Sequence, residues 1–328
     1  MPRSQDYERV DPDSFDRPRR RTRPRTKERP SYADAVPGLV TTVDRGRFTC
    51  AVEDRTVMAM KSRPLGRKGV VVGDRVRLVG DTSGDPGTLA RIVSIDERTS
   101  TLRRTADDDD PVERILVANA DQLVVVVALA DPEPRVGLID RALVAAYDEG
   151  MDPLLVLTKA DLASPDELLQ TYGPLDVPYV VTERGADVSP IRALLRGRTS
   201  VLLGHSGVGK STLVNALVPG TDRATGHVNE VTGRGRHTST SALMLPLPGG
   251  GWIIDTPGIR SFGLAHVETA HLIHAFPDLD ELTDLCTRGC THAEAEPECG
   301  LDEAASDLQV SRAESFRRLL ASRDTAGY

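Results

Sequence analysis

The chain has 328 residues, of which 39% are hydrophobic and 27% are charged, so it is long enough for two or three ordinary domains. This composition excludes a wholly disordered protein. The longest apolar run, Leu123 to Ala130, is far shorter than the roughly 20 residues of a membrane span, so we expect no transmembrane helix. The N-terminus has no apolar signal segment, and four cysteines do not make a disulfide framework. We therefore expect a cytoplasmic protein with no membrane partner.

The charge is unevenly distributed along the chain. Residues 1–105 carry 23 Lys and Arg against 15 Asp and Glu, whereas residues 106–328 carry 18 against 34. This asymmetry indicates that the N-terminal part meets a polyanion. The densest stretch, Arg17 to Arg29, holds seven Arg and Lys27 with prolines between them. It predicts a disordered arm over residues 1–35, with a solvated tail without a specific partner as the alternative.

Five short β-rich runs follow the arm, between residues 36 and 105. They are separated by Gly, Asp or Arg and carry basic side chains. The pattern predicts a small barrel such as an OB-fold, which frequently binds oligonucleotides, and a barrel that binds no RNA is the alternative. The runs are residues 38–43, 47–52, 56–60, 70–78 and 88–95.

An acidic, turn-prone linker at residues 107–111 precedes a change of pattern. Beyond it, apolar strands alternate with helices, which predicts a mostly parallel α/β sheet over residues 106–265. Residues 266–328 are expected to be helical, with a Cys- and His-rich loop. The expected strands of the sheet are residues 122–129, 153–157, 177–182, 200–203 and 252–254, and the expected helices are residues 139–150 and 210–217.

A phosphate-binding loop is the most specific motif of the chain. Residues 204–211 read GHSGVGKS and fit G-x-x-x-x-G-K-[ST] between a predicted strand and a predicted helix. The glycines let backbone N–H groups turn toward phosphates, Lys210 would reach the β- and γ-phosphates, and the Ser211 hydroxyl would bind Mg²⁺. The nucleotide-binding residues predicted here are Gly204, His205, Ser206, Gly207, Val208, Gly209, Lys210, Ser211 and Thr212.

Two segments after this loop match other parts of a nucleotide hydrolase. Asp255 ends a predicted strand and begins Asp-Thr-Pro-Gly, so it would hold Mg²⁺ through water while the Gly258 amide meets the γ-phosphate. The Gly- and Thr-rich residues 219–242 lie where a GTPase keeps the threonine that completes the Mg²⁺ shell. Thr238 is favoured over Thr240 for that role.

A base-recognition motif precedes the phosphate loop. Residues 158–161, TKAD, end a predicted strand and are similar to the N-K-x-D motif of GTPases. The Asp161 carboxylate can accept two hydrogen bonds from guanine that adenine cannot offer, and the stem of Lys159 would pack along the base. Thr158 replaces the usual Asn, so we expect a weaker tie to the phosphate loop. The predicted base-binding residues are Thr158, Lys159, Ala160 and Asp161.

Three of the four cysteines lie with one histidine within a short polar segment. The spacing is Cys286-x3-Cys290-x-His292-x6-Cys299. Three thiolates and one imidazole complete a tetrahedral structural Zn²⁺ site with no open position. Free thiols in a reduced protein are the alternative.

Because the base motif comes before the phosphate loop, the motif order of an ordinary GTPase is permuted. From about residue 36 to about residue 323, the sequence resembles the circularly permuted RsgA (YjeQ) family of GTPases. The resemblance implies an OB-fold at residues 36–105, a permuted P-loop GTPase domain at 106–265 and a helical zinc domain at 266–328, with the four Cys and His ligands matched. It is carried by residues 71–76, 118–123, 138–143, 204–212, 235–240 and 255–258.

The resemblance also implies an activity. It implies that the protein hydrolyses GTP to GDP with Mg²⁺. It also implies that the small (30S) ribosomal subunit and its rRNA stimulate this hydrolysis late in subunit maturation. We expect the chain to be monomeric. Ile259 stands where many GTPases carry a water-positioning Gln, so His237, which matches the family's switch histidine, is the candidate catalytic residue. The alternatives are a non-hydrolysing RNA-binding module, a GTPase serving the large subunit or another RNA, and a P-loop ATPase.

Overall fold

The computed structural model describes residues 32–66, 69–105, 113–220, 242–256, 267 and 269–323. The chain divides into two compact units, residues 1–33 and 34–328, and the second holds almost everything described. The Arg-rich stretch of the predicted arm lies outside the described residues, as do the predicted site residues His237, Thr238 and Gly258. Among the described helices, none combines the length and hydropathy that a membrane crossing requires.

Five strands form a closed barrel, and this confirms the predicted OB-like fold. β1 pairs antiparallel with both β2 and β4, and β3 pairs in parallel with β5, so the ring closes in the order β1-β2-β3-β5-β4. The inward side chains of alternate residues, such as Val57 and Ala59, fill the interior. The strands are β1 (Val36–Asp44), β2 (Arg47–Val52), β3 (Arg55–Lys61), β4 (Arg75–Val79) and β5 (Ala90–Ile95), with a short 3-10 helix η2 (Arg63–Leu65) after β3.

A hairpin that the sequence did not predict follows the barrel. β6 (Thr101–Thr105) and β7 (Glu113–Ala118) pair antiparallel on either side of the acidic segment expected to be a linker. The barrel approaches this hairpin closely, because a Cβ added at Gly73 would lie 2.0 Å from the Ala118 carbonyl oxygen. The Asn119 side-chain amide also donates to the Gly73 carbonyl at 2.8 Å. The barrel is therefore joined to the next region by close backbone packing.

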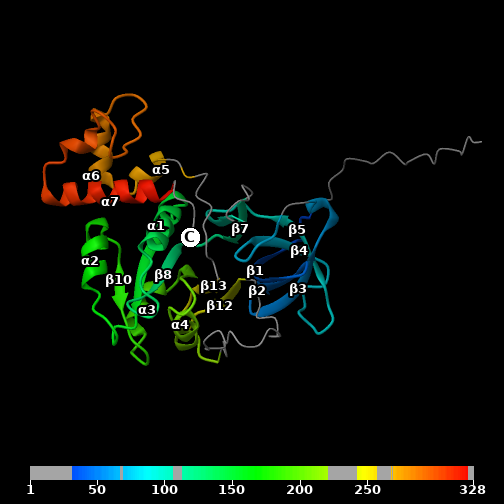
Figure 1. The fold of residues 1–328 in the computed structure, drawn as a ribbon. Coiled ribbons are helices and arrows are strands. Elements are labelled where there is room, and N and C mark those ends of the chain that lie inside the picture. Colours follow the sequence, from blue (N-terminus) through cyan, green and yellow to red (C-terminus); the bar gives the residue numbers. More distant parts are fainter. Residues whose placement is uncertain are drawn as a thin grey trace, which may run out of the picture. The chain divides into compact units, whose positions relative to one another are not determined.

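The central sheet is mostly parallel, as predicted (Figure 1). Its order is β10-β9-β8-β11-β13-β12, in which β12 alone runs antiparallel to its neighbour, and one residue pair, Thr42 with Leu243, links β12 to β1 of the barrel. The strands are β8 (Gln122–Ala128), β9 (Asp152–Thr158), β10 (Tyr179–Val181), β11 (Thr199–Leu203), β12 (Leu243–Pro246) and β13 (Trp252–Asp255).

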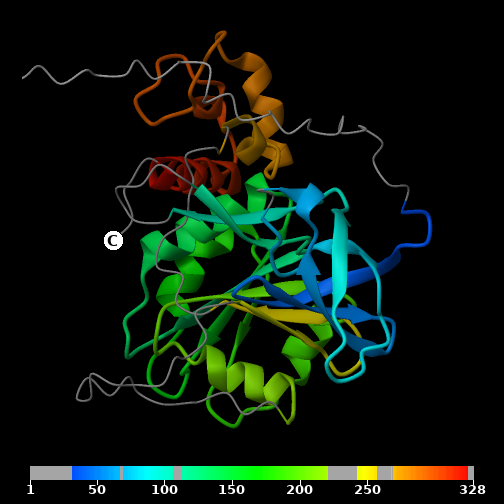
Figure 2. The same cartoon turned by 90° about the vertical axis from the view of Figure 1, so that its right-hand side faces the viewer.

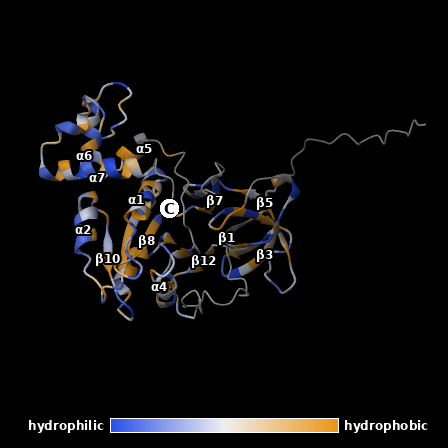
Figure 3. Cartoon of the chain, viewed as in Figure 1, coloured by the Kyte–Doolittle hydropathy of each residue, from blue (hydrophilic) through white to orange (hydrophobic). Residues whose placement is uncertain are grey.

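Helices cover both faces of this sheet. All seven residues of β8 are buried, and its apolar colouring is visible in Figure 3. Successive side chains of a strand point to opposite faces, so Val125 packs with α1 on one face while Val126 packs with α3 and α4 on the other. The helices are α1 (Val136–Asp148), α2 (Asp166–Tyr172), η3 (Gly173–Leu175), α3 (Ser189–Leu195) and α4 (Lys210–Leu217).

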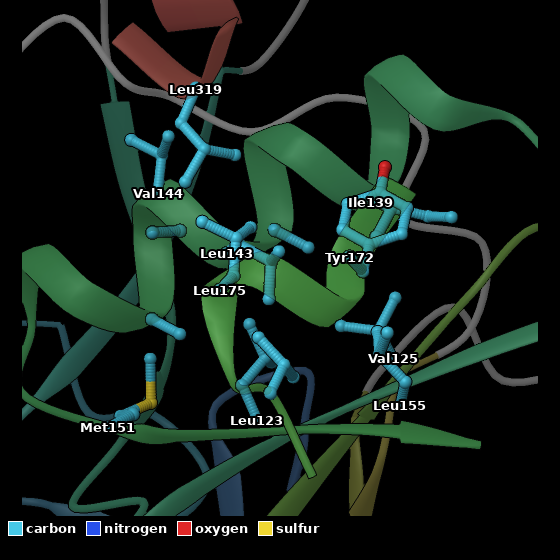
Figure 4. Packing of buried hydrophobic residues seen from close by; sticks show 14 of the residues in the cluster. Leu123, Val125, Ile139, Leu143, Val144, Met151, Leu155, Tyr172, Leu175 and Leu319 are labelled. Atoms are coloured by element: carbon cyan, nitrogen blue, oxygen red, sulfur yellow. The ribbon is translucent and has the colours of Figure 1, made fainter. Parts of the chain in front are cut away.

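The C-terminal region is helical, as predicted, and packs on α1. Phe316, Leu319 and Leu320 of α7 belong to the same buried cluster as Val144 of α1, and Figure 4 shows Leu319 beside Val144. Figure 2 shows α7, in red, alongside α1. The elements are α5 (Thr269–Ile273), α6 (Pro277–Asp280), η4 (Glu281–Leu285), η5 (Gly300–Glu303) and α7 (Asp307–Arg323).

Candidate nucleotide site and metal centre

The permuted motifs meet at the carboxyl edge of the sheet. The strand register pairs Thr158 with Ala128 and Asp255 with Leu202, while Leu203, opposite Val125, leads directly into the phosphate loop. Parallel strands end at one edge, so the carboxyl ends of β9, β11 and β13 share it. The order in which the chain visits these strands does not alter this convergence.

The phosphate loop has the backbone that its glycines predict. A Cβ added at Gly204 would lie 2.3 Å from the Val126 carbonyl oxygen, so only glycine fits against β8. Gly207 and Gly209 have φ of +85° and +95°, which disfavour other residues. Gly209 caps α4, whose first residue is Lys210. The loop therefore turns from strand to helix over the six residues 204–209 and directs a helix N-terminus to the edge of the sheet.

Lys210 is turned back onto its own loop. Its ammonium donates to the carbonyl of His205 at 3.0 Å and also contacts the carbonyl of Gly204. Burial lowers the pKa of Lys210 to about 8. A phosphate anion at this position would favour the charged ammonium and reverse that shift.

Thr158 links the base motif to the phosphate loop. Its side chain is buried, and its hydroxyl donates to the Val208 carbonyl at 2.7 Å while lying 3.2 Å from the Val127 carbonyl. The sequence predicted a weaker tie here because Asn is absent. The threonine hydroxyl nevertheless makes a direct hydrogen bond between the two loops.

Two of the remaining residues of the base motif are held by neighbouring segments, and the third, Asp161, is exposed. Lys159 has a positive φ of +60°, and its ammonium contacts the Asp131 carbonyl in the connection from β8 to α1. The Ala160 amide donates to the Thr182 carbonyl at 3.2 Å, which holds the motif against the segment after β10. Asp161 is exposed, as a carboxylate that is to accept hydrogen bonds from a base must be.

Asp255 ends β13 at the same edge. It is 3% exposed, and the next residue, Thr256, donates its hydroxyl to the Leu202 carbonyl at 2.7 Å. This bond holds the end of β13 against β11, the strand that leads into the phosphate loop. Ser211 lies in the first turn of α4, half-buried. The structure thus brings the described parts of the phosphate, base and Asp255 motifs to one edge.

Sequence reasoning missed one wall of this site. The connection from β8 to α1 lines a pocket beside the phosphate loop, together with the end of β8, the start of α1 and two residues of the loop. The signal that could have found it is its position, because residues 129–135 directly follow a buried parallel strand. The pocket is lined by Val125, Val126, Val127, Ala128, Pro132, Glu133, Pro134, Arg135, Leu138, Ile139, His205 and Val208.

The four predicted metal ligands converge between η4 and η5. The Nδ1 atom of His292 lies 3.6, 3.4 and 3.7 Å from the sulfur atoms of Cys286, Cys290 and Cys299. All four donor atoms fall within 4.8 Å of one another. In a tetrahedral site with Zn–S near 2.3 Å and Zn–N near 2.0 Å, sulfur and nitrogen are about 3.5 Å apart. The donor set and its spacing therefore fit one tetrahedral metal ion.

The backbone around this cluster is built for close approach. The Gly300 amide donates to the Cys286 sulfur at 3.1 Å, and a Cβ at Gly300 would lie 2.1 Å from the Leu282 carbonyl oxygen. Such an N–H bond to sulfur stabilises a thiolate. Cys50 lies apart from the cluster, buried in the barrel core, as expected of a small apolar side chain.

This fold and edge define the class of protein, a circularly permuted P-loop GTPase. The structure matches YloQ, described as a circularly permuted GTPase, with a TM-score of 0.63, 22% identity and coverage of 91% of this chain and 99% of that one. It matches YjeQ from Thermotoga maritima with the same TM-score, 28% identity and coverage of 88% and 98%.

Sequence comparison narrows the class to a family. The model of the RsgA GTPase family matches residues 95–265. The chain is 42% identical over 264 residues to the small ribosomal subunit biogenesis GTPase RsgA of Azotobacter vinelandii, covering 77% of this chain and 75% of that one. It is 38% identical over 284 residues to the protein of that name from Gemmatimonas aurantiaca, covering 83% and 89%. The chain therefore belongs to the RsgA GTPase family, which confirms the predicted resemblance.

Proposed function

We propose that this chain hydrolyses GTP during the biogenesis of the small ribosomal subunit, the role that the names of its relatives state for them. The observation that carries the proposal is the bond from Thr158 to Val208, which unites a guanine-type motif with a phosphate loop in an RsgA-family fold. Binding of the subunit and its rRNA would stimulate hydrolysis. A protein that acts on ribosomal subunits would be located in the cytoplasm, and we propose that it acts there as a monomer.

The proposed nucleotide contacts follow from the residue types at the edge of the sheet. Residues 204–212 would cradle the phosphates, with the Lys210 ammonium on the β- and γ-phosphates, and residues 158–161 would bind guanine through Asp161. Ser211 and Asp255 would hold Mg²⁺, which when bound neutralises charge on the phosphate oxygens. The described residues 204, 209 and 210 support this assignment by their backbone and by the placement of Lys210.

Three proposed contacts fall outside the described residues. Gly258 would meet the γ-phosphate through its amide, Thr238 would complete the Mg²⁺ shell, and His237 would orient the attacking water. They rest on the sequence pattern and the family alone. Ile259 offers no polar atom for orienting water, so slow intrinsic hydrolysis is part of the proposal.

The metal that we propose for Cys286, Cys290, His292 and Cys299 is Zn²⁺. Three thiolates and one imidazole leave no open position, as in structural zinc sites, and soft sulfur ligands disfavour Mg²⁺ and Ca²⁺. We also propose domains at residues 1–35, 36–105, 106–265 and 266–328. β6 ends at the proposed boundary after residue 105 and β7 follows it, so the domains at residues 36–105 and 106–265 each contribute one strand to this hairpin.

Multiple-turnover phosphate release with purified small subunits titrated in tests the proposal. We expect slow release by the protein alone and a large rise with small subunits, and no release by a Lys210→Ala variant in either condition. Equal stimulation by large subunits, or hydrolysis of ATP that GTP does not displace, would replace the proposal with one of its alternatives. Release that small subunits do not change would contradict the assigned role on the small subunit.

A further inference from the structure

Helix α1 packs on the central sheet and on the C-terminal helices, and its two ends lie near other parts of the described fold. The segment leading into its first turn lines the pocket beside the phosphate loop, together with His205. Near its end, Glu149 accepts hydrogen bonds from the amide and hydroxyl of Thr101 in β6, both at 2.7 Å. Asp148 contacts His271 of α5 at 3.0 Å. The start of this helix therefore shares a pocket with the phosphate loop, its end is bonded to the hairpin next to the barrel, and its last residue contacts the C-terminal region.

The middle of α1 holds an ion pair with α7 in which the carboxylate is buried and the arginine is half-buried. The Asp140 side chain is 4% exposed, and its Oδ2 lies 3.3 Å from Nε of Arg318, a residue 178 positions later in the chain. The Tyr172 hydroxyl lies 3.0 Å from Oδ1 of Asp140, and the Arg318 guanidinium covers the Tyr172 ring at 5.2 Å. Tyr172 lies beside Ile139 under α1 in Figure 4.

This ion pair fixes the position of α7 along α1 more strictly than apolar packing does. The attraction between leucine and valine side chains is non-directional, whereas a buried carboxylate must keep its partner within hydrogen-bond distance. Burial raises the pKa of Asp140 while Arg318 opposes that rise, so the charged state of Asp140 depends on its partner. Losing Arg318 would leave a buried acid without its cation.

On its other side, α7 reaches the metal centre. Phe316 of α7 packs edge-on against Phe276 at 5.9 Å between ring centroids, and the His292 ring lies 6.5 Å from the Phe316 ring. Arg317 donates to the His292 carbonyl at 3.4 Å. The helix that carries Arg318 is therefore held by the same segment that holds the metal ligands.

We propose that Arg318 and Asp140 are positioning residues for the stimulated hydrolysis of GTP, because their ion pair joins α7 to α1, the helix that follows the β8–α1 connection beside the phosphate loop. A ribosomal subunit that binds the C-terminal region would then influence the nucleotide site through this ion pair and α1. Stimulation by the small subunit rests on the function proposed above, whereas the coupling between α7 and the phosphate loop can be tested without ribosomes.

Variants of α7 separate this role from general packing. Arg318→Leu is expected to lower the stimulated kcat about tenfold, with KM for GTP, unstimulated hydrolysis and metal content within about twofold of the parent. Arg312→Leu is the control on the same helix, because Arg312 also forms an ion pair, with Asp278, and donates to the Pro174 carbonyl, so its bonded partners lie outside α1. The Arg312 side chain is 19% exposed against 33% for Arg318, while Asp278 is more exposed than Asp140, at 29% against 4%. An equal loss in Arg312→Leu would overturn the proposal.

A double variant distinguishes positioning from stability. Asp140→Asn combined with Arg318→Leu removes the unpaired acid, so it is expected to melt closer to the parent than Arg318→Leu does. Stimulation is expected to stay low in this double variant, since the ion pair is gone and, among the described contacts, apolar packing and the 3.3 Å bond from Arg141 to the Ser322 carbonyl are left to join α1 to α7. If stimulation returned together with the melting temperature, the pair would be merely structural and the proposal would fail.

A measurement without ribosomes keeps the two proposals apart. If the parent protein showed no stimulation, the proposed function would have failed, and amide exchange of α7 would then test the coupling between α7 and the phosphate loop directly. GDP is expected to slow exchange at residues 315–322 in the parent and in Arg312→Leu, but not in Arg318→Leu. Equal GDP protection in all three proteins would overturn the inference whatever the ribosome does.

Discussion

Replacing Thr158 by valine tests how the base motif is joined to the phosphate loop. Valine has the shape of threonine without the hydroxyl, so Thr158→Val removes the 2.7 Å bond to the Val208 carbonyl and little else. Since Thr158 is 8% exposed, water cannot freely replace that donor. The two loops would then hold their bound geometry less firmly.

The size of the effect follows from the buried carbonyl. Leaving a buried acceptor without its donor costs about 1–3 kcal/mol, part of which is lost protein stability rather than lost binding. If about 1 kcal/mol appears in binding, GDP affinity falls about fivefold, since 1.4 kcal/mol corresponds to a factor of ten. Titration with a fluorescent GDP analogue at fixed Mg²⁺, beside a melting curve, measures both shares.

Two variants make the result interpretable. Thr158→Ser keeps the hydroxyl and is expected to bind GDP within about twofold of the parent, because only a methyl group is lost. Thr182→Val removes a nearby hydroxyl whose described contact is a 3.5 Å approach to the Glu183 carbonyl, so its GDP affinity should not change. Parent-like binding by Thr158→Val, or an equal loss in Thr182→Val, would refute the assigned link.

Three further predictions concern single groups. Burial lowers the pKa of Lys210 to about 8, so about half of the Lys210 side chains are neutral at pH 8 in the free protein. Binding of GDP should therefore take up about half a proton per chain at pH 8 and almost none at pH 6. Calorimetry in two buffers measures this proton uptake, and equal uptake at both pH values would contradict the prediction. Asp161→Asn should weaken GTP binding and favour a xanthine nucleotide, so competition assays that find GTP affinity unchanged would remove Asp161 from the site. Cys290→Ser should reduce the metal content well below one Zn²⁺ per chain, whereas Cys50→Ser, outside the cluster, should not; full zinc in both would end the assignment.

The elements that sequence predicted well are those with strong local signals. The strand β8 is a run of apolar residues that only a two-sided burial explains, and the phosphate loop combines fixed glycines with a strand before and a helix after. The barrel strands alternate and are bounded by turn residues. In each case the residues that decide the structure are neighbours in the chain.

The elements that sequence missed depend on distant partners. β6 and β7 are short and rich in charged residues, so their hairpin was hidden by the acidic segment between them. β12 spans four residues and gains its place from β13 beside it. The pair of Asp140 and Arg318 joins two helices through a contact that no local pattern encodes. The bond made by Thr158 was not predicted, because its acceptor, the Val208 carbonyl, belongs to another loop.

Circular permutation changes the connections of the sheet without changing its edge. A parallel sheet is held by the pairing of neighbouring strands, so loops at its carboxyl edge meet whichever strand comes first in the chain. What permutation alters is the segment that follows Asp255, since the chain now runs on to the C-terminal helices. Those helices end with α7 on α1, whose leading segment lines the pocket beside the phosphate loop. In the permuted order, the backbone after Asp255 connects this edge to the C-terminal region, and the ion pair of Asp140 and Arg318 is the second connection that we propose. If both act, a change in the C-terminal region is felt at the edge of the sheet through the chain itself and through α1.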